Sequence, residues 1–217
     1  MKTARMDIRG VREQTLGSQV PTILTEFYCN HCPGLTEIPP LPLGLEIFHC
    51  TFNPQLKSLP DLSLLDSLVE FNCTGSGIER IGVFPKSLKR LDCSYCKDIT
   101  IIDGLPDSLI ELNCTSTSIT TLPKLPPGLK ILNISCNKIS RIDELPKGLL
   151  ELKCNYTLLE SLPVLPSSLT LIECAHTKLN PESIPSGIKC IGLPKKIIQP
   201  AIIPESIRND SECCLLS

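Results

Sequence analysis

The chain has 217 residues, 41% of them hydrophobic, and a formal net charge of −2, so it is long enough to bury a sizeable core. A charge near zero argues against a nucleic-acid protein, and a mean hydropathy of +0.13 argues against intrinsic disorder. No apolar run approaches the roughly 18 residues of a membrane-spanning helix, and the first ten residues lack the apolar stretch of a secretory signal. We therefore expect a cytoplasmic protein whose 13 cysteines are free thiols.

The segment LxxLxC, or a variant of it, recurs between residues 22 and 193. Residues 1–21 precede it, and we expect them to form an N-terminal cap or tail. The copies begin 19 to 23 residues apart, at Leu24, Leu45, Leu68, Leu88, Leu109, Leu129, Leu149, Leu169 and, in a degenerate ninth copy, Ile188. Alternate residues of one copy, such as Leu91 and Cys93, would share one interior if the segment is a β-strand. Because one coil cannot bury its apolar side alone, the pattern predicts a β-rich solenoid of stacked coils with a parallel sheet on its concave face.

Each copy continues with two further features. A small polar residue stands three positions after the last core residue, at Cys32, Asn53, Ser76, Cys96, Thr117, Asn137, Thr157 and Thr177. We expect this polar column to bond to backbone groups of adjacent coils that would otherwise be buried and unpaired. A proline-rich return follows, as in the sequence LPKLPPG at 122–128. Proline lacks an N–H donor and favours extended geometry, so we predict an extended or polyproline convex side with few or no helices.

These repeats resemble the leucine-rich repeat, LxxLxLxxN/CxLxxLPxLPxx, over about 80% of the chain. The 20-residue period with its LPxLP return is similar to the short class found in secreted effector proteins of bacterial pathogens. Some effectors of this class carry a ubiquitin-ligase domain with a catalytic cysteine after the repeats. Only about 24 residues follow the last copy here, so we expect no such domain.

Two CxxC pairs, Cys29–Cys32 and Cys93–Cys96, could indicate a zinc site. In the repeat phase, however, the first cysteine of each pair falls in the core and the second in the polar column. The pairs lie three coils apart, about 14 Å at the usual strand spacing, which is too far to share one ion with Zn–S bonds of about 2.3 Å. We therefore interpret the cysteines as structural thiols and expect no metal site.

Five Asn-x-Ser/Thr triplets match the N-glycosylation signal. They begin at Asn72, Asn113, Asn133, Asn155 and Asn209. Four of them fall in repeat phase on or beside the expected strands, and we interpret them as by-products of the repeat.

The outward residues of the expected strands, and those just beyond them, form columns across the concave face. Solenoids bind macromolecules on such extended surfaces, and aromatic and Arg residues concentrate binding energy when an interface buries them. The candidates for partner binding are Tyr28, His49, Glu70, Arg90, Asp92, Tyr95, Glu111, Glu151, Lys153 and Tyr156. The alternative is that these are ordinary solvated strand positions.

The sequence contains no GxSxG, HExxH or glycine-rich phosphate loop, and we identify no catalytic residue and no cofactor. We therefore argue against an enzyme. The hypothesis is a monomeric, non-enzymatic protein-interaction module that binds a protein partner on its concave face and no nucleic acid. The alternative is a purely structural or adhesive repeat protein with no lipid anchor.

Residues 194–217 are expected to form a tail that ends in Cys213-Cys214-Leu215-Leu216-Ser217. The last four residues fit the C-a-a-X prenylation signal of the farnesyl type, which would place the lipid on Cys214. One lipid gives only marginal membrane binding, so palmitoylation of Cys213 would supply the second signal. This hypothesis predicts a scaffold or effector in a eukaryotic (host) cytosol, on the cytosolic face of a host or cellular membrane. The alternative is an unmodified tail with two ordinary thiols.

Overall fold

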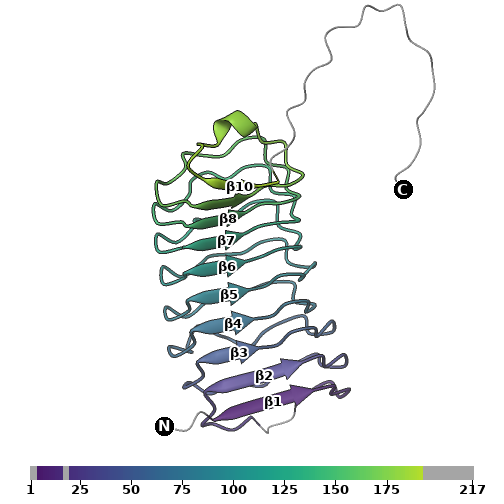
Figure 1. Cartoon of the computed structure of the whole chain (residues 1–217). Helices are drawn as coiled ribbons and strands as arrows, with labels where there is room; N and C mark the ends of the chain where they lie inside the picture. Colours follow the sequence, from purple (N-terminus) through teal and green to yellow (C-terminus); the bar gives the residue numbers. More distant parts are fainter. Residues whose placement is uncertain (1–3, 17–19, 193–217) are drawn as a thin grey trace, which may run out of the picture.

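The computed structural model of the chain describes residues 4–16 and 20–192. Within them the chain winds into stacked coils, and each coil contributes one strand to a ten-stranded parallel sheet whose strands follow in sequence order (Figure 1). The strands are β1 (Arg5–Arg9), β2 (Glu26–Asn30), β3 (Ile47–His49), β4 (Glu70–Asn72), β5 (Arg90–Asp92), β6 (Glu111–Asn113), β7 (Ile131–Asn133), β8 (Glu151–Lys153), β9 (Leu171–Glu173) and β10 (Lys189–Ile191). The predicted solenoid with a parallel sheet is confirmed.

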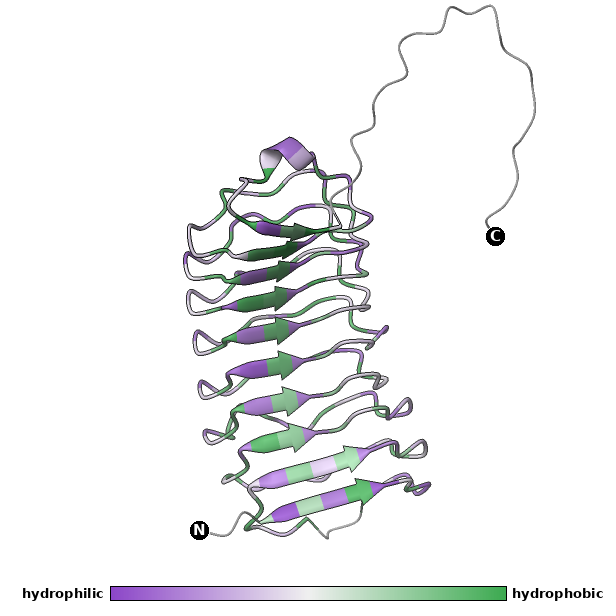
Figure 2. Cartoon of the chain, in the orientation of Figure 1, coloured by the Kyte–Doolittle hydropathy of each residue, from purple (hydrophilic) through white to green (hydrophobic). Residues whose placement is uncertain are grey.

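The core runs along the axis of the stack because equivalent residues of successive coils pair in register. Phe27 pairs with Phe48, and Phe48 with Phe71. These three rings are fully buried and stacked, with centroids 5.7 and 5.4 Å apart. In β3 to β9 a buried central residue lies between two outward residues. Figure 2 shows that strands of the sheet carry both hydrophilic and hydrophobic residues. Period-two alternation therefore separates the core from the exposed side of the sheet.

A column of buried cysteines lies on the core side of the sheet, at or just after the ends of the strands. Its members are Cys29, Cys50, Cys73, Cys93, Cys114, Cys154 and Cys174, with Ile134 in the place of an eighth. All 11 cysteines within the described residues are free thiols. Burial raises the pKa of the Cys114 thiol to about 12. The column is therefore neutral and packs as small apolar side chains do.

The polar column satisfies backbone groups between coils, as the sequence predicts. Asn53 accepts a hydrogen bond from the backbone N–H of Cys32 and donates one to the carbonyl of Cys29, both at 2.8 Å. Cys96 fills the same role with sulfur, because its Sγ donates to the carbonyl of Cys73 at 3.0 Å. Within the described residues no buried side-chain nitrogen or oxygen lacks a partner. This explains why asparagine, serine, threonine and cysteine all occur at this position.

The side of each coil away from the sheet carries the proline-rich returns. The part of the chain that the structure describes contains one short 3-10 helix, η1 (Pro181–Ser183), and no α-helix. No described helix is long and apolar enough to cross a membrane. The predicted helix-poor convex side is confirmed, and prolines explain it because they cannot donate helix hydrogen bonds.

The sheet begins within residues 1–21, the segment expected to form a cap or tail. Its β1 pairs in parallel with β2, with Met6 opposite Phe27 and Ile8 opposite Cys29. A further bridge joins Thr15 to Glu37 in the next coil. The segment therefore contributes a strand of its own to the sheet, although it lacks the LxxLxC pattern. Residues 194–217 lie outside the described residues.

Candidate protein-binding face

The outward side chains of β1 to β9 form one surface, which we call the sheet face. It corresponds to the concave face of the sequence analysis. Two columns of aligned residues cross it. The first column contains Arg5, Glu26, Ile47, Glu70, Arg90, Glu111, Ile131, Glu151 and Leu171, and the second Asp7, Tyr28, His49, Asn72, Asp92, Asn113, Asn133, Lys153 and Glu173.

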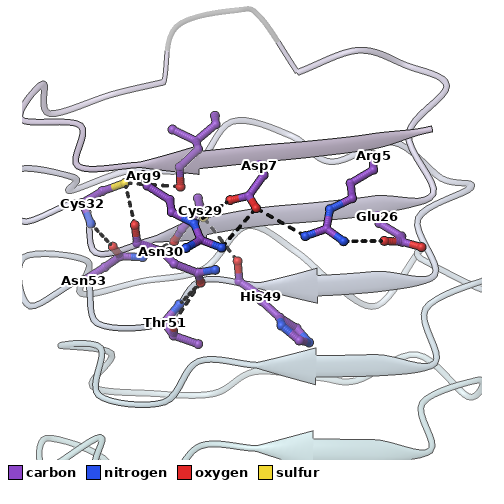
Figure 3. Close-up of polar contacts among 11 residues, drawn as sticks. Arg5, Asp7, Arg9, Glu26, Cys29, Asn30, Cys32, His49, Thr51 and Asn53 are labelled. Carbon is purple, nitrogen blue, oxygen red and sulfur yellow. Dashed lines mark hydrogen bonds and ion pairs between the residues drawn. The ribbon is translucent and has the colours of Figure 1, made fainter. Parts of the chain in front are cut away.

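Charged residues of β1 pair with one another and with β2 (Figure 3). Asp7 accepts hydrogen bonds from Arg9 Nε at 3.2 Å and from Arg5 Nη2 at 3.3 Å. Arg5 also lies 3.9 Å from a carboxylate oxygen of Glu26. The hydrogen bond from Arg9 is the largest effect that lowers the pKa of Asp7. The contribution of β1 to this face was not predicted, because the strand carries no repeat motif.

Four of the candidate binding residues form a chain of side-chain contacts across β2 to β5. Tyr28 packs edge-on against His49, with ring centroids 4.9 Å apart. His49 Nε2 lies 2.8 Å from Glu70 Oε1, and Arg90 Nε donates to Glu70 Oε2 at 2.8 Å. Desolvation raises the pKa of Glu70, but the hydrogen bonds from Arg90 and His49 outweigh it and leave the pKa below its usual value. Tyr28, His49, Glu70 and Arg90 therefore already have partners within the chain.

Asp92 caps the end of its strand. Its Oδ1 accepts hydrogen bonds from the backbone N–H of Ser94 at 2.9 Å and from the Ser94 hydroxyl at 2.6 Å. Asn113 donates to the other carboxylate oxygen at 3.0 Å. The Asn-x-Thr triplets that begin at Asn72 and Asn113 make the same bonds to the threonine two residues later. These glycosylation-like triplets are thus strand-end turns, in which the Asn side chain holds its own backbone.

The carboxylates of Glu111 and Glu151 differ from all of these. Neither carboxylate forms a hydrogen bond or ion pair with any described residue, and Ile131 separates them in the column. Lys153, in the second column, lies 3.3 Å from Glu173. A shallow depression of about 300 Å³ extends over β4 to β8, and its lining includes Glu70, Arg90, Asp92, Glu111, Ile131 and Lys153. The structure therefore brings five of the predicted candidates to one depression.

Tyr95 and Tyr156 lie beyond the strands, on what we call the turn edge. One residue of each coil has a left-handed backbone there, with φ between 54° and 68°. These residues are His31, Phe52, Gly75, Tyr95, Ser116, Cys136, Tyr156 and His176. Tyr95 is 55% exposed and Tyr156 is 57% exposed. His31 stacks on Phe52 at 4.7 Å, and Tyr156 on His176 at 4.3 Å.

Bulky side chains are unusual in left-handed backbone. The repeat phase indicates this column of residues but not its backbone conformation, and His31, Phe52 and His176 were not among the predicted candidates. The signal that could have found them is the aromatic ring that stands two positions after the core cysteine in several copies, as at His31, Phe52 and His176. The turn edge therefore adds exposed aromatic rings beside the sheet face.

From the sequence we expected no metal site, and we predicted lipidation at the end of the chain. Within residues 4–16 and 20–192, no group of three or more His, Cys, Asp and Glu side chains is placed to hold a metal ion. Cys213 and Cys214, the predicted lipidation sites, lie outside the described residues.

No protein-family model and no curated protein sequence matches the chain. Solved structures do match. The leucine-rich repeat domain of a Shigella effector is 17% identical with a TM-score of 0.58, and the match covers 87% of this chain and 81% of that one. The leucine-rich effector YopM from Yersinia pestis is 24% identical with a TM-score of 0.55, over 78% of this chain and 54% of that one. The functional domain of InlJ from Listeria monocytogenes, which includes a cysteine ladder, is 22% identical with a TM-score of 0.54, over 87% and 53%.

These similarities show the fold: the chain is a leucine-rich repeat solenoid similar to those of bacterial effectors. It spans most of the Shigella domain but only about half of the YopM and InlJ structures.

Proposed function

We propose that the protein is a non-enzymatic interaction module that binds a protein partner on the sheet face, over β6 to β8. The observation that carries this proposal is the pair of carboxylates, Glu111 and Glu151, that have no partner among the described residues, while the charges of β1 to β5 are satisfied by one another. Solenoids use such extended surfaces for macromolecules. A partner protein with cationic side chains at this position would form ion pairs with the carboxylates of Glu111 and Glu151.

The partner is expected to be basic where it meets the sheet face. Glu111 and Glu151 lie two strands apart in one column, which corresponds to about 10 Å at the usual strand spacing. Two Lys or Arg side chains at that separation would pair with both carboxylates. Tyr95 and Tyr156 on the adjacent turn edge would supply aromatic anchors, since exposed aromatic residues concentrate binding energy. The charges would also speed association and make it sensitive to salt.

The experiment compares partner capture by three forms of the full chain. The test variant is Glu111→Gln with Glu151→Gln, and the matched control is Asp107→Asn with Glu144→Gln, which removes the same charge from the proline-rich side. Wild type and control should retain the same basic partner, with affinity at least about tenfold above that of the test variant. The difference in affinity between wild type and the test variant should decrease at high salt, because salt screens the charges.

Equal retention by all three forms would contradict binding through these carboxylates. Retention of no protein by any form would favour the alternative, a structural or adhesive repeat. Light scattering of the purified chain checks the expectation that it acts as a monomer, and addition of DNA or RNA fragments checks the expectation that it binds no nucleic acid.

The proposal includes a membrane location, through farnesylation of Cys214 and palmitoylation of Cys213. Its support is the C-a-a-X match of the last four residues of the printed sequence. The fold shared with the Shigella and Yersinia effectors is consistent with action in a host cytosol. Expression of wild type and Cys214→Ser in eukaryotic cells, with fractionation and intact mass, provides the test. A farnesyl-sized mass increase and membrane recovery are expected for wild type alone; identical cytosolic recovery of both forms, without added mass, would contradict the anchor.

A further inference from the structure

Two cysteines from neighbouring coils meet at the C-terminal end of the described sheet. Cys174 directly follows β9, and Cys190 is the central residue of β10. Their sulfur atoms lie 3.5 Å apart although the residues are 16 positions apart in the chain. The proposed binding on the sheet face involves neither thiol, so this contact is a separate feature of the fold.

The backbones of the two coils approach closely around these sulfurs. The backbone N–H of Cys174 donates to the carbonyl of Ile191 at 2.9 Å. Gly192 has a φ of +76°, and a Cβ at this glycine would lie 2.5 Å from the Cβ of Ala175. A disulfide needs sulfurs about 2.05 Å apart, so about 1.5 Å remains to be closed. Among the described strands β10 has a neighbour on one side only, β9, which leaves it freer to make this shift than an internal strand.

Access distinguishes this pair from the other close pair of sulfurs among the described residues. Cys73 and Cys96 lie 3.9 Å apart, and both are fully buried between internal coils. Cys174 is also fully buried, but Cys190 is partly exposed. Of these four thiols, Cys190 is therefore the one that a small oxidant would meet first, whereas Cys73 and Cys96 need the coils to separate.

We propose that Cys174 and Cys190 form a reversible disulfide that staples the last described coil to the solenoid, with glutathione disulfide or another small disulfide as the oxidant. The Cys190 thiolate attacks one sulfur of glutathione disulfide, which forms a mixed disulfide and releases one glutathione thiolate. Cys174 then loses its proton and attacks the Cys190 sulfur, which forms the protein disulfide and releases the second glutathione. Two protein thiols are oxidised and one glutathione disulfide is reduced to two glutathiones.

This order of attack follows from the surroundings of the two thiols. Burial, together with the hydrogen bond to Cys190, raises the pKa of Cys174 well above its usual value. Cys174 therefore remains protonated and unreactive until the mixed disulfide forms beside it. The bond would close the loop of residues 175–189, which contains η1 and whose Leu179 side chain is buried in the core. A coil with one neighbour opens more easily than an internal coil. Among the described coils the one with β10 has a single neighbour, so a staple there would oppose its opening.

The test incubates the reduced full chain in glutathione redox buffers, alkylates the remaining thiols, and maps disulfides by mass spectrometry. Cys190→Ser and Cys174→Ser should abolish the new bond. The matched control is Cys154→Ser, which removes the buried thiol one coil earlier and should leave the bond intact. Wild type should lose 2 Da through a Cys174–Cys190 bridge. Proteolysis within residues 175–189 should slow about tenfold on oxidation.

Three results would overturn the proposal. The first is a stable glutathione adduct on Cys190 that never resolves to an internal bridge. The second is a bridge from Cys190 to a cysteine other than Cys174. The third is a Cys73–Cys96 bridge that forms equally fast, because general opening of the stack, and not access at its end, would then control oxidation.

Discussion

The first-column carboxylates of the two halves of the sheet face differ in whether the described chain gives them partners. From β1 to β5 the outward side chains contact one another in a chain that runs from Arg9 through Tyr28 and Glu70 to Arg90. Over β6 to β8 the carboxylates of Glu111 and Glu151 have no partner among the described residues. Side chains that satisfy one another stiffen a surface, whereas unsatisfied charges on a rigid sheet are available to a ligand. The difference therefore favours β6 to β8 as the binding region.

Below the surface the two halves share the same frame. Asn53 in the first half and Asn137 in the second each accept a hydrogen bond from a backbone N–H of the preceding coil and donate to a carbonyl there. The cysteine column passes through both halves. The frame depends on residues that face inward, so the outward columns are free to differ.

The largest effect is expected for Cys93→Asp, at the junction of the two halves. Cys93 is fully buried, and burial raises its pKa, so a carboxylate there would be desolvated without a cation. We expect a loss of about 4–5 kcal/mol in the free energy of unfolding. Urea denaturation measures the loss, and hydrogen exchange should show it spreading outward from β5 because coils couple to their neighbours. A denaturation curve like that of wild type would mean that this cysteine does not lie in the core.

If the polar column supports both halves in the same way, Asn53→Ala and Asn137→Ala should lower the free energy of unfolding by equal amounts. Each change leaves a buried backbone N–H and a buried carbonyl without a partner, which costs about 2–4 kcal/mol. Equilibrium unfolding of the two variants provides the measurement. Losses that differ by more than about 2 kcal/mol would show that the halves do not share one frame.

A smaller effect is expected at the turn edge for Gly75→Ala. Gly75 has a φ of +68°, and an added Cβ would lie 2.7 Å from Phe52 Cδ1, so the backbone is strained and the exposed ring must move. We expect a loss of about 1–2 kcal/mol in the free energy of unfolding. Gly82→Ala is the matched control, because it has open space and no left-handed backbone. Thermal melting compares the two, and equal stability would contradict strain at Gly75.

The smallest effect concerns the charges of the two halves. Glu70→Gln leaves Arg90 and His49 without their carboxylate and should cost up to about 1 kcal/mol at neutral pH. Glu111→Gln removes an unpaired carboxylate and should leave the free energy of unfolding nearly unchanged. Urea denaturation of both variants at pH 7 compares the losses. Equal losses would contradict the difference between the halves.

The same pair carries a pH dependence. The pKa of Glu70 is lower in the folded chain than its usual value of 4.5. The ionised form therefore stabilises the fold above that value, and the contribution is lost as pH falls through the lower, folded pKa. The difference in stability between wild type and Glu70→Gln should shrink on acidification below about pH 4.5. A difference that is constant down to pH 3 would show that the Glu70 pairs do not stabilise the fold.

The printed sequence determined the solenoid, the strand positions, the core and the polar column. These follow from local order: alternate residues of LxxLxC share a side, and a repeat of about 20 residues places each copy above the last. The same reasoning identified Glu111 and Glu151 as outward residues. It also placed Glu70 and Arg90 in the same column, although it could not tell which of these charges would be satisfied.

Only the tertiary structure decided which side chains meet across coils. Glu70 pairs with Arg90, whereas Glu111 has no partner among the described residues. This difference depends on side-chain geometry between strands, about which the sequence pattern carries no information. The pairing of β1 depends on Met6 and Ile8 fitting against the next coil, and no repeat motif in the sequence predicts it. The left-handed turn edge and the contact between Cys174 and Cys190 likewise depend on how closely two coils approach. Periodicity determines which face a residue occupies, and three-dimensional packing determines its partners.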